Sequence, residues 1–358
     1  MTNPVAIAVS GGVDSLVAAY LLKQHHGDVI GLHFLTGYED PSESLAAAVA
    51  DRFAQMDIPI IIVDLCAAFK THVVNYFVAA YRGGQTPNPC LVCNVRIKFG
   101  ALLDAAQKHG ASRLATGHYA CITKDPCGRY GLKKGIDTAK DQSYFLSRLT
   151  SDQLSRACFP LGTWTKGRVR ALAAEKKLFP VTRKESQDVC FIRDGNYAHF
   201  LEKEAGIPAI PGDIVTVRGD FVGRHKGLYH YTIGQRRGIN CPAARAYYVI
   251  DLNPLENQLI VGHTEDLQAA GCQVADINWI SGVPEKAVTA LVRLRYRHTA
   301  VPATLMPMGE NSAQVWFDTP QNAVTPGQAA VFYREEAVLG SGWIVSSFKD
   351  PCPGSGPR

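Results

Sequence analysis

Two groups of residues have the types and spacing needed for chemistry: the run Ser-Gly-Gly-Val-Asp-Ser at residues 10–15, and the cysteines Cys90, Cys93 and Cys190. The run follows an apolar stretch that predicts a buried strand, and it precedes apolar residues at helical spacing. Backbone N–H groups at such a helix N-terminus favour an anion, so the run predicts a phosphate-binding turn with Asp14 available to a magnesium ion. The run has neither a Walker ending nor dinucleotide-type glycine spacing.

The cysteines stand in polar or rigid surroundings, which favours reactivity over burial. Pro87 and Pro89 flank Asn88, remove backbone donors and predict a rigid, extended loop over residues 83–93. Asn94 is expected to cap the next helix, which would leave Cys93 at a helix N-terminus where a thiolate is stabilised. Cys190 follows a polar loop at residues 185–188.

Composition indicates a globular protein with two or three domains: 358 residues, of which 46% are hydrophobic and 19% charged. A formal net charge of +5 means that a nucleic-acid partner would be bound by local basic patches. We expect a cytoplasmic enzyme without a membrane partner, since no signal peptide or long apolar run is found. In that reducing compartment the ten cysteines would ligate metal or do chemistry rather than crosslink the fold.

The elements that position these residues alternate between strand and helix. After the first strand we expect strands at residues 29–34 and 58–63, helices at residues 44–56 and 67–81, and a short strand ending in a turn at residues 113–119. This order predicts an α/β fold with a doubly wound parallel sheet, whose ligands bind at the carboxyl ends of the strands. The phosphate turn lies at one such end.

The second half of the chain has a different pattern of residues. Beyond residue 149 it is helical and basic, and from about residue 208 short β-rich runs alternate with glycine and proline. We predict a catalytic domain at residues 1–205, a central β-rich domain at 206–270, a C-terminal β-barrel that contacts RNA at 271–349, and a tail at 350–358.

Seven separated stretches resemble one family in order and spacing: residues 10–15, 86–94 with 97–99, 115–119, 140–146, 190–192, 232–238 and 325–328. The chain resembles the bacterial tRNA 2-thiouridylases (the MnmA family) of the ATP pyrophosphatase (PP-loop) superfamily. The resemblance implies ATP-dependent adenylation of O2 of wobble uridine 34 in the tRNAs for Lys, Glu and Gln, with magnesium. Sulfur transfer from a cysteine persulfide then gives 2-thiouridine, AMP and pyrophosphate.

The same resemblance implies roles for individual residues. Cys93 would be the nucleophile, Cys190 the persulfide carrier that forms a disulfide with it, and Asp14 a catalytic residue. The nucleotide would contact Ala8, Val9, Ser10, Gly11, Gly12, Val13, Asp14, Ser15, Phe34 and Gly117. The tRNA would contact Asn88, Pro89, Cys90, His118, Lys140, Asp141, Gln142, Arg295, Tyr296, Arg297 and Gln328. A cysteine desulfurase or a sulfur-relay protein would supply the sulfur.

Two positions depart from the family pattern. Cys90 stands where many relatives carry Asp, so Cys90, Cys93 and Cys190 could instead hold a four-iron four-sulfur (4Fe-4S) cluster. Zinc is a further alternative, but no fourth ligand is evident nearby. Leu16 stands where relatives usually carry Ser, which removes a hydroxyl donor from the phosphate turn.

Several alternatives stay open at this level. Residues 293–298 predict a strand with one basic face, which would contact phosphate or simply face solvent. Asp141 could cap a helix and His118 could close a turn without contacting a ligand. An amide-forming or small-molecule adenylating enzyme would not need the cysteines, and a non-catalytic tRNA-binding or sulfur-carrier protein would not turn over ATP.

Overall fold

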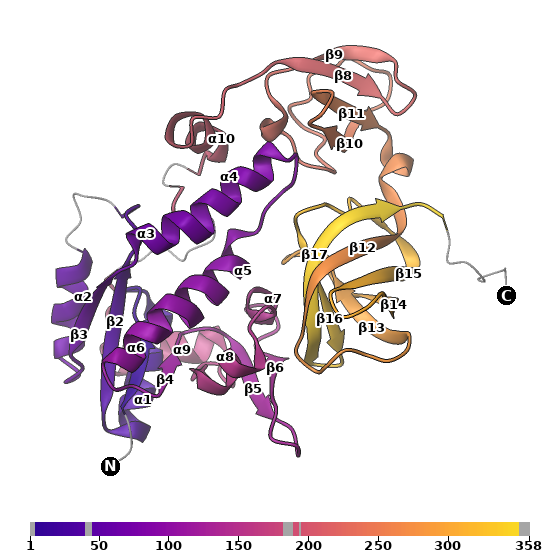
Figure 1. The fold of residues 1–358 in the computed structure, drawn as a ribbon. Coiled ribbons are helices and arrows are strands. Elements are labelled where there is room, and N and C mark those ends of the chain that lie inside the picture. The colour runs from indigo at the N-terminus through magenta and orange to yellow at the C-terminus, as the bar shows by residue number, and fades with distance from the viewer. Residues whose placement is uncertain (1–3, 40–44, 182–188, 193–194, 351–358) are drawn as a thin grey trace. The chain divides into compact units, whose positions relative to one another are not determined.

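The computed structural model describes residues 4–39, 45–181, 189–192 and 195–350, and the chain divides into two compact units (Figure 1). The first unit contains Met1–Val74, Pro89–Arg193 and Glu335–Leu339. The second contains Asn75–Asn88, Asp194–Arg334 and Gly340–Arg358. The polar loop expected at residues 185–188 and almost all of the expected tail lie outside the described residues.

A five-stranded parallel sheet organises the first unit. Its strands, in spatial order, are β3 (Ile60–Asp64), β2 (Val29–Leu35), β1 (Val5–Ala8), β4 (Arg113–Ala115) and β7 (Ala157–Cys158). The chain moves outward from β1 in one direction and then returns to its other side, so the predicted doubly wound fold is confirmed. The two-residue strand β7 was not predicted, because a pair of apolar residues carries no periodicity.

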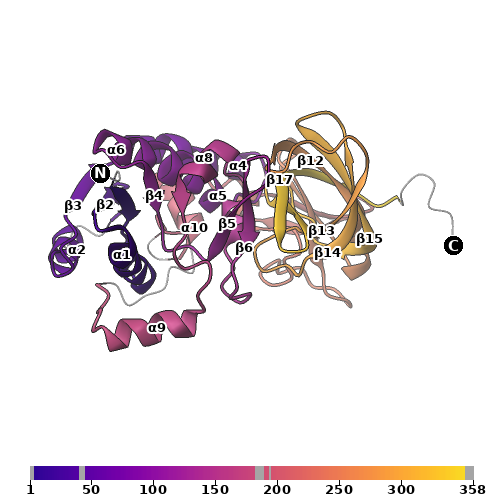
Figure 2. The same cartoon turned by 90° about the horizontal axis from the view of Figure 1, so that it is seen from below.

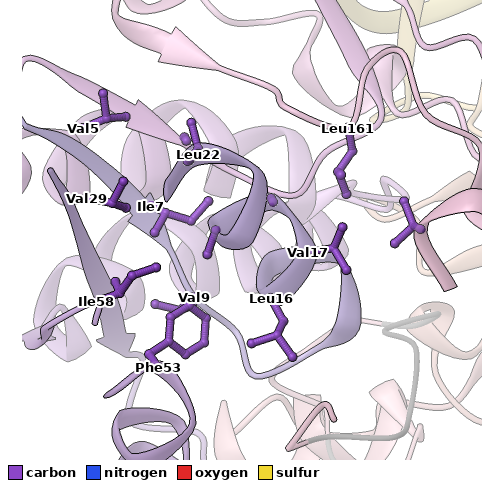
Figure 3. Close-up of a cluster of buried hydrophobic side chains, with 14 of the residues drawn as sticks. Val5, Ile7, Val9, Leu16, Val17, Leu22, Val29, Phe53, Ile58 and Leu161 are labelled. Atoms are coloured by element: carbon purple, nitrogen blue, oxygen red, sulfur yellow. The ribbon is translucent and has the colours of Figure 1, made fainter. Parts of the chain in front are cut away.

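Helices cover both faces of this sheet. Figure 2 shows α1 (Val13–His26), α2 (Leu45–Ala54) and α9 (Lys166–Glu175) on one face and α6 (Leu103–Lys108) on the other. Side chains of β1 alternate between the faces, and Ile7 packs with Leu16 of α1 in one apolar cluster (Figure 3). This cluster fixes the α1 N-terminus against the end of β1.

Leu16 itself belongs to that cluster and is 1% exposed. Its side chain therefore faces the core, and only its backbone N–H, which donates to the Gly12 carbonyl at 3.2 Å, lies in the first turn of α1. Burial of a leucine contributes about 2 kcal/mol, so the residue stabilises the contact between helix and sheet. The sequence prediction of a lost phosphate donor at this position has no support in the geometry.

The helical segments after β3 and before β4 are wound irregularly. The helix expected at residues 67–81 consists of α3 (Cys66–Phe69), the π-helical η1 (Lys70–Val74) and α4 (Asn75–Arg82) in succession. The loop expected at residues 83–93 ends earlier than predicted, because α5 (Pro89–Cys93) is already helical. Proline fits the first position of a helix, where its missing N–H is not needed.

The remaining elements of the first unit lie around the same sheet. The strands β5 (Ala120–Lys124) and β6 (Tyr130–Lys134) form a hairpin, whose Leu132 and Lys133 pair with Val338 and Ala337 of β17 (Ala337–Phe348). Two short helices follow it, α7 (Ser143–Leu146) and α8 (Ser151–Arg156). Thr150 and Gln153 form a capping box that begins α8.

The second unit begins its own β structure with a four-stranded sheet. Its order is β10 (Tyr248–Asn253), β11 (Gln258–Gly262), β8 (Gly212–Thr216) and β9 (Phe221–His225). Ile214, Val249, Leu259 and Val261 form its buried core. Short helical turns precede, interrupt and follow this sheet: α10 (Tyr197–His199), η3 (Phe200–Glu204), η4 (Leu228–His230) and η5 (Thr264–Leu267).

A six-stranded barrel completes the second unit. Its strands are β12 (Gln268–Trp279), β15 (Ser312–Asn322), β14 (Val301–Pro307), β13 (Val288–Arg293), β16 (Ala329–Arg334) and β17 (Ala337–Phe348) in spatial order, and β17 pairs again with β12. Closure removes the exposed strand edges. The predicted C-terminal barrel is therefore confirmed.

The prediction of a strand over residues 293–298 is wrong. Strand β13 ends at Arg293, and the next residues turn: the His298 N–H donates to the Arg295 carbonyl at 3.0 Å, and Arg293 Nε donates to the His298 carbonyl at 3.0 Å. The alternation of basic and apolar residues imitates a strand, but these bonds close a turn instead. Separately, none of the helices in the described ranges has the length and apolar character of a membrane span.

Candidate active site

The turn between β1 and α1 exposes the start of a helix. Gly11 has a φ of +78°, and Gly12 is the N-cap residue of α1 and offers no side chain to its first N–H groups. Ser15 Oγ donates to the Gly12 carbonyl at 2.9 Å, which braces the turn from within. Residues 10–15 thus present helix-terminal N–H groups as an anion-binding turn requires.

The end of β4 meets this turn. A Cβ atom on Gly117 would lie 2.8 Å from the carbonyl carbon of Asp14 and 2.9 Å from the backbone nitrogen of Ser15, so only glycine permits this contact. Strands β1 and β4 are neighbours at the point where the strand order reverses. Ligands of doubly wound sheets bind at such a point. Two of the predicted nucleotide segments therefore touch.

Asp14 is paired with a lysine that was not singled out in the sequence. Lys166 Nζ lies 2.8 Å from both carboxylate oxygens of Asp14, and Tyr119 Oη donates to Asp14 Oδ1 at 2.7 Å. Lys166 is 6% exposed. The carboxylate expected to ligate magnesium is thus held by two protein donors, and the hard oxygen ligand that Mg²⁺ prefers lies beside the phosphate turn.

Other residues expected at the nucleotide lie along the same edge of the sheet. Phe34 is half-buried near the carboxyl end of β2, and its neighbour His33 is buried with Nδ1 2.9 Å from the Val9 carbonyl. Val9 in turn donates its N–H to the Leu32 carbonyl at 2.9 Å, which continues the ladder beyond β1.

The three cysteines form one electrostatic neighbourhood in the first unit. Desolvation raises the pKa of Cys93 to about 12 and that of Cys90 to about 11, and it also raises the pKa of Cys190. Cys190 raises the thiol pKa of both Cys90 and Cys93, while Lys98 lowers the pKa of all three thiols. Thiols far apart in the sequence are brought together.

The expectation that Cys93 begins a helix is wrong. Helix α5 ends at Cys93 and η2 (Asn94–Leu102) follows directly, so no helix N-terminus is available to stabilise its thiolate. Asn94 does not cap a helix either, because its Nδ2 donates to the Phe145 carbonyl at 2.9 Å. Without the dipole of a helix start, desolvation dominates, and the thiol is held in its protonated form.

Lys98, whose charge lowers the pKa of all three thiols, lies in the π-helical segment η2. Backbone hydrogen bonds in such a segment run from residue i to residue i+5. Within η2 the backbone of Gly100 departs from helical angles (φ −112°, ψ −105°). π-Helical segments occur often at functional sites.

His118 holds this lysine. Lys98 Nζ lies 3.3 Å from His118 Nε2, and His118 Nδ1 lies 2.6 Å from Thr116 Oγ1. An ammonium only donates, so Nε2 accepts and Nδ1 carries the proton that is donated to Thr116. Burial and the nearby Lys98 lower the pKa of His118 well below its ordinary value, so the ring is neutral at physiological pH.

Cys190 is anchored by the residue that follows it. The Phe191 ring packs against Tyr38 and Phe69 at centroid distances of 5.9 and 5.7 Å, while Cys190 itself keeps an exposed surface. The residue is thus exposed although its thiol is desolvated, and Phe191 fixes its position in the first unit.

Residues 116–119 connect the two parts of the site. Gly117 packs on the phosphate turn, Tyr119 donates to Asp14, and His118 accepts from the lysine that faces the thiols. Four consecutive residues thus contact both the nucleotide turn and the cysteine cluster.

The cluster alternative does not fit the cysteines as they are placed. In the part of the chain that the structure describes, no three His, Cys, Asp or Glu side chains lie in an arrangement that would hold a metal ion. Cys90, Cys93 and Cys190 are all described, and they share a neighbourhood without forming such a group.

The predicted RNA-contacting triplet is largely engaged within the protein. Asp141 is 3% exposed, and its carboxylate accepts from the N–H groups of Gly135 and Ser143 and from Ser143 Oγ at 2.9–3.1 Å. Gln142 Oε1 accepts from the Tyr119 N–H at 3.0 Å. Asp141 thus accepts from the N–H of Ser143, the first residue of α7, although Gln142 is the N-cap residue of this helix and caps it with no side-chain bond. Lys140 is half-buried.

Three further predicted contacts belong to the second unit. Gln328 Nε2 donates to the Thr86 carbonyl at 2.9 Å, so the side chain supports the chain that leads to Asn88. Arg295 and Arg297 are exposed in the turn after β13, and Tyr296 between them is half-buried. They present two cations at one turn.

Lys98, Lys166 and Tyr119 were not selected from the sequence. Lys98 stood inside the Ile-Lys-Phe part of a family motif, and Tyr119 directly followed His118 in another, so both had a motif as a signal. Lys166 stood in a basic helical stretch, which is usually a solvated face.

Comparison with known proteins assigns the chain to a family. Three family models match in succession: the tRNA methyl transferase HUP domain at residues 3–194, the tRNA methyl transferase PRC-barrel domain at 198–263, and the aminomethyltransferase beta-barrel domain at 269–344.

Similar curated proteins cover nearly the whole chain. A tRNA-specific 2-thiouridylase MnmA from Desulfosudis oleivorans is 54% identical over 96% of this chain and 95% of that protein. One from Geotalea uraniireducens is 43% identical over 95% and 94%, and an MnmA 2 from a Thermoanaerobacter species is 44% identical over 98% and 100%. By the three successive domain matches and this identity over its length, the chain belongs to the family of tRNA-specific 2-thiouridylases.

Proposed function

We propose that this chain is an ATP-dependent tRNA 2-thiouridylase that converts uridine 34 of the tRNAs for Lys, Glu and Gln to 2-thiouridine. The observation that carries the proposal is the bridge formed by residues 116–119, which touch both the phosphate turn and the lysine facing the thiols. Two half-reactions need two sites within reach of one base, and this connection supplies that proximity.

The first half-reaction activates an oxygen. Uridine O2 attacks the α-phosphorus of ATP, the bond from this phosphorus to the bridging oxygen breaks, and pyrophosphate leaves with the electron pair. The helix-terminal N–H groups of residues 10–15 would bind the phosphates. Magnesium would be held by Asp14 together with phosphate oxygens, and it neutralises charge on the nucleotide when bound.

The second half-reaction replaces the activated oxygen with sulfur. The terminal sulfur of a Cys190 persulfide attacks C2 of the adenylated uridine. Cys93 then attacks Sγ of Cys190, so that a Cys93–Cys190 disulfide forms and the electron pair of the broken S–S bond stays on the transferred sulfur. AMP leaves and 2-thiouridine remains. A thiol reductant and a sulfur donor, such as a cysteine desulfurase or a sulfur-relay protein, would restore the starting state.

The thiols need an activating change before they react. Their pKa values lie above the physiological range in the protein alone, and Lys98 is the cation that lowers all three. Binding of the adenylated base beside Lys98 would bring the electrophile to a thiol that stays protonated until the base is bound. A persulfide is a stronger acid than a thiol, which also favours Cys190 as the carrier.

The proposed RNA contacts follow from exposure. Arg295 and Arg297 would bind backbone phosphate, and Tyr296 would stack or pack against the RNA. Asn88, Pro89 and Cys90 lead directly into the helix that carries Cys93, so we place the target base there. Lys140 would contact RNA directly, while Asp141 and Gln142 hold its segment in place.

The decisive test is mass spectrometry of nucleosides from tRNA incubated with the protein, ATP and sulfide. We expect 2-thiouridine at position 34 only when ATP is present, with AMP released in proportion. ATP-to-AMP turnover that ignores tRNA would indicate a small-molecule adenylating enzyme. Retention of sulfur on Cys190 without AMP release would indicate a carrier protein.

A further inference from the structure

Lys166 occupies a position that opposes two general preferences of lysine. It is the first residue of α9, where the helix dipole disfavours a cation, and it is 6% exposed, although lysine is rarely so deeply buried. Its ammonium lies 2.8 Å from both oxygens of Asp14 in the first turn of α1. Only a strong local demand for positive charge accounts for a lysine here.

The fold fixes the backbone of Lys166 independently of Asp14. Thr165 Oγ1 accepts from the Arg168 N–H at 3.3 Å and caps α9, and the backbone N–H of Lys166 donates to Asp137 Oδ2 at 2.8 Å. Val169 and Ala173 of α9 pack in the same core cluster as α1. Lys166 is therefore carried to the phosphate turn by α9 itself.

The charges at this point balance only while Asp14 faces Lys166. Asp14 and Lys166 neutralise each other, and the α1 N-terminus adds a partial positive charge beside them. A magnesium ion that takes the Asp14 carboxylate would leave the ammonium without its anion, directly beside bound phosphates. A magnesium-bound polyphosphate brings both the cation for Asp14 and the anion for Lys166.

We propose that Lys166 is a catalytic residue that exchanges partners, leaving Asp14 for the β- and γ-phosphates when magnesium-bound ATP enters. This inference rests on the proposed ATP-dependent function. During adenylation the bond between the α-phosphorus and the bridging oxygen breaks, and the electron pair moves to pyrophosphate. The Lys166 ammonium stabilises that developing negative charge, and no proton transfer is required.

The test is calorimetric binding of ATP, pyrophosphate and AMP, each with magnesium, to the full chain and to Lys166→Gln. We expect the affinity for ATP and for pyrophosphate to fall by about 10- to 100-fold, since one charge-assisted contact is lost. Affinity for AMP should stay within about twofold, because AMP lacks the phosphates that Lys166 would contact. A merely structural role would weaken all three ligands together.

Two further variants separate this role from folding. Lys166→Gln leaves the Asp14 carboxylate half-buried and unpaired by its lysine, so the double variant Asp14→Asn with Lys166→Gln restores a neutral pair. It should recover thermal stability while pyrophosphate binding stays weak. Lys176→Gln removes an exposed cation from the other end of α9 and should bind all three ligands as the unchanged chain does.

The outcomes are distinct. Unchanged ATP and pyrophosphate affinity in a folded Lys166→Gln protein overturns the role of Lys166 and leaves the proposed function standing. Loss of AMP binding to the same degree overturns it as well. If the unchanged chain binds no magnesium-bound ATP, the proposed function fails and this inference fails with it.

Discussion

The phosphate turn and the cysteine cluster lie in one unit and share residues 116–119, yet they are prepared to very different degrees. At the turn, opposite charges are paired at 2.8 Å and no side chain caps the first N–H groups of α1. At the cluster, desolvation outweighs the nearby lysine, and the thiols keep their protons. The phosphate turn is thus formed without a ligand, whereas burial favours the protonated form of the thiols.

This difference suits the order of the proposed reaction. A thiolate that formed before adenylation would be exposed to oxidants and to wrong electrophiles, whereas a bound nucleotide without an acceptor is harmless. The neutral His118 matters here, because it accepts from Lys98 without adding a charge of its own. The following predictions test whether the phosphate turn and the cysteine cluster act independently of each other.

The largest effect is expected from Cys93→Ser, which removes a thiol from the cysteine cluster and leaves the phosphate turn unchanged. Thiolation, measured as retardation of tRNA in mercury-containing gels, should fall by about 1,000-fold or more, since the attacking sulfur is removed. ATP binding and tRNA binding should stay within a few fold. Cys127→Ser is the matched control. Cys127 is exposed in the hairpin of the first unit, so this variant should thiolate tRNA at the normal rate. Normal retardation with Cys93→Ser removes this residue from the mechanism.

The pH dependence of alkylation tests whether the thiol is held inactive. Without RNA, the rate at which iodoacetamide modifies Cys93 should rise about tenfold per pH unit from pH 7 to pH 10, because the thiol pKa is raised to about 12. A rate that levels off near pH 9 would show that the free protein already activates Cys93. The same shift means that folding stability is lost as the pH rises above the ordinary thiol pKa.

Lys98→Met tests whether the cation near the thiols controls their ionisation. Removing the cation that lowers the thiol pKa values should slow alkylation of Cys93 severalfold at a fixed pH, because less thiolate is present. Lys98→Arg keeps the charge and should stay close to the unchanged chain. Equal alkylation rates in Lys98→Met and the unchanged chain would show that Lys98 does not control the thiol.

Much of the fold followed from the sequence because its signals are local. Buried strands such as Val29–Leu35 are continuous apolar runs, and the alternation with helices fixes a parallel sheet. Errors arose where local signals conflict with tertiary contacts. Pro89 suggests a loop but starts a helix, and Asn94 suggests a cap but bonds to Phe145 across the fold.

The site was predictable where a motif carried it and not where packing did. The turn at residues 10–15 and the proximity of Cys93 to Cys190 could be expected, the latter through resemblance alone. The influence of Lys98 on Cys190 depends on contacts between segments far apart in the sequence, and the pairing of Lys166 with Asp14 depends on how α9 packs against α1. Neither arrangement produces a periodic pattern of residues from which it could be predicted.

The smallest effect is expected from Arg295→Ala in the barrel, which tests whether the cysteine end waits for RNA. Arg295 is exposed, whereas Arg293 is engaged with the His298 carbonyl, so Arg295 is free to contact a phosphate. We expect tRNA affinity to fall about two- to fivefold, and the slope of log affinity against log salt concentration to flatten by roughly one. Arg218→Ala, at an exposed arginine between β8 and β9, serves as the control. Thiolation at saturating tRNA should stay unchanged, because the RNA that is bound would activate Cys93 to the same degree. A lower thiolation rate at saturating tRNA would mean that the barrel itself takes part in activating Cys93.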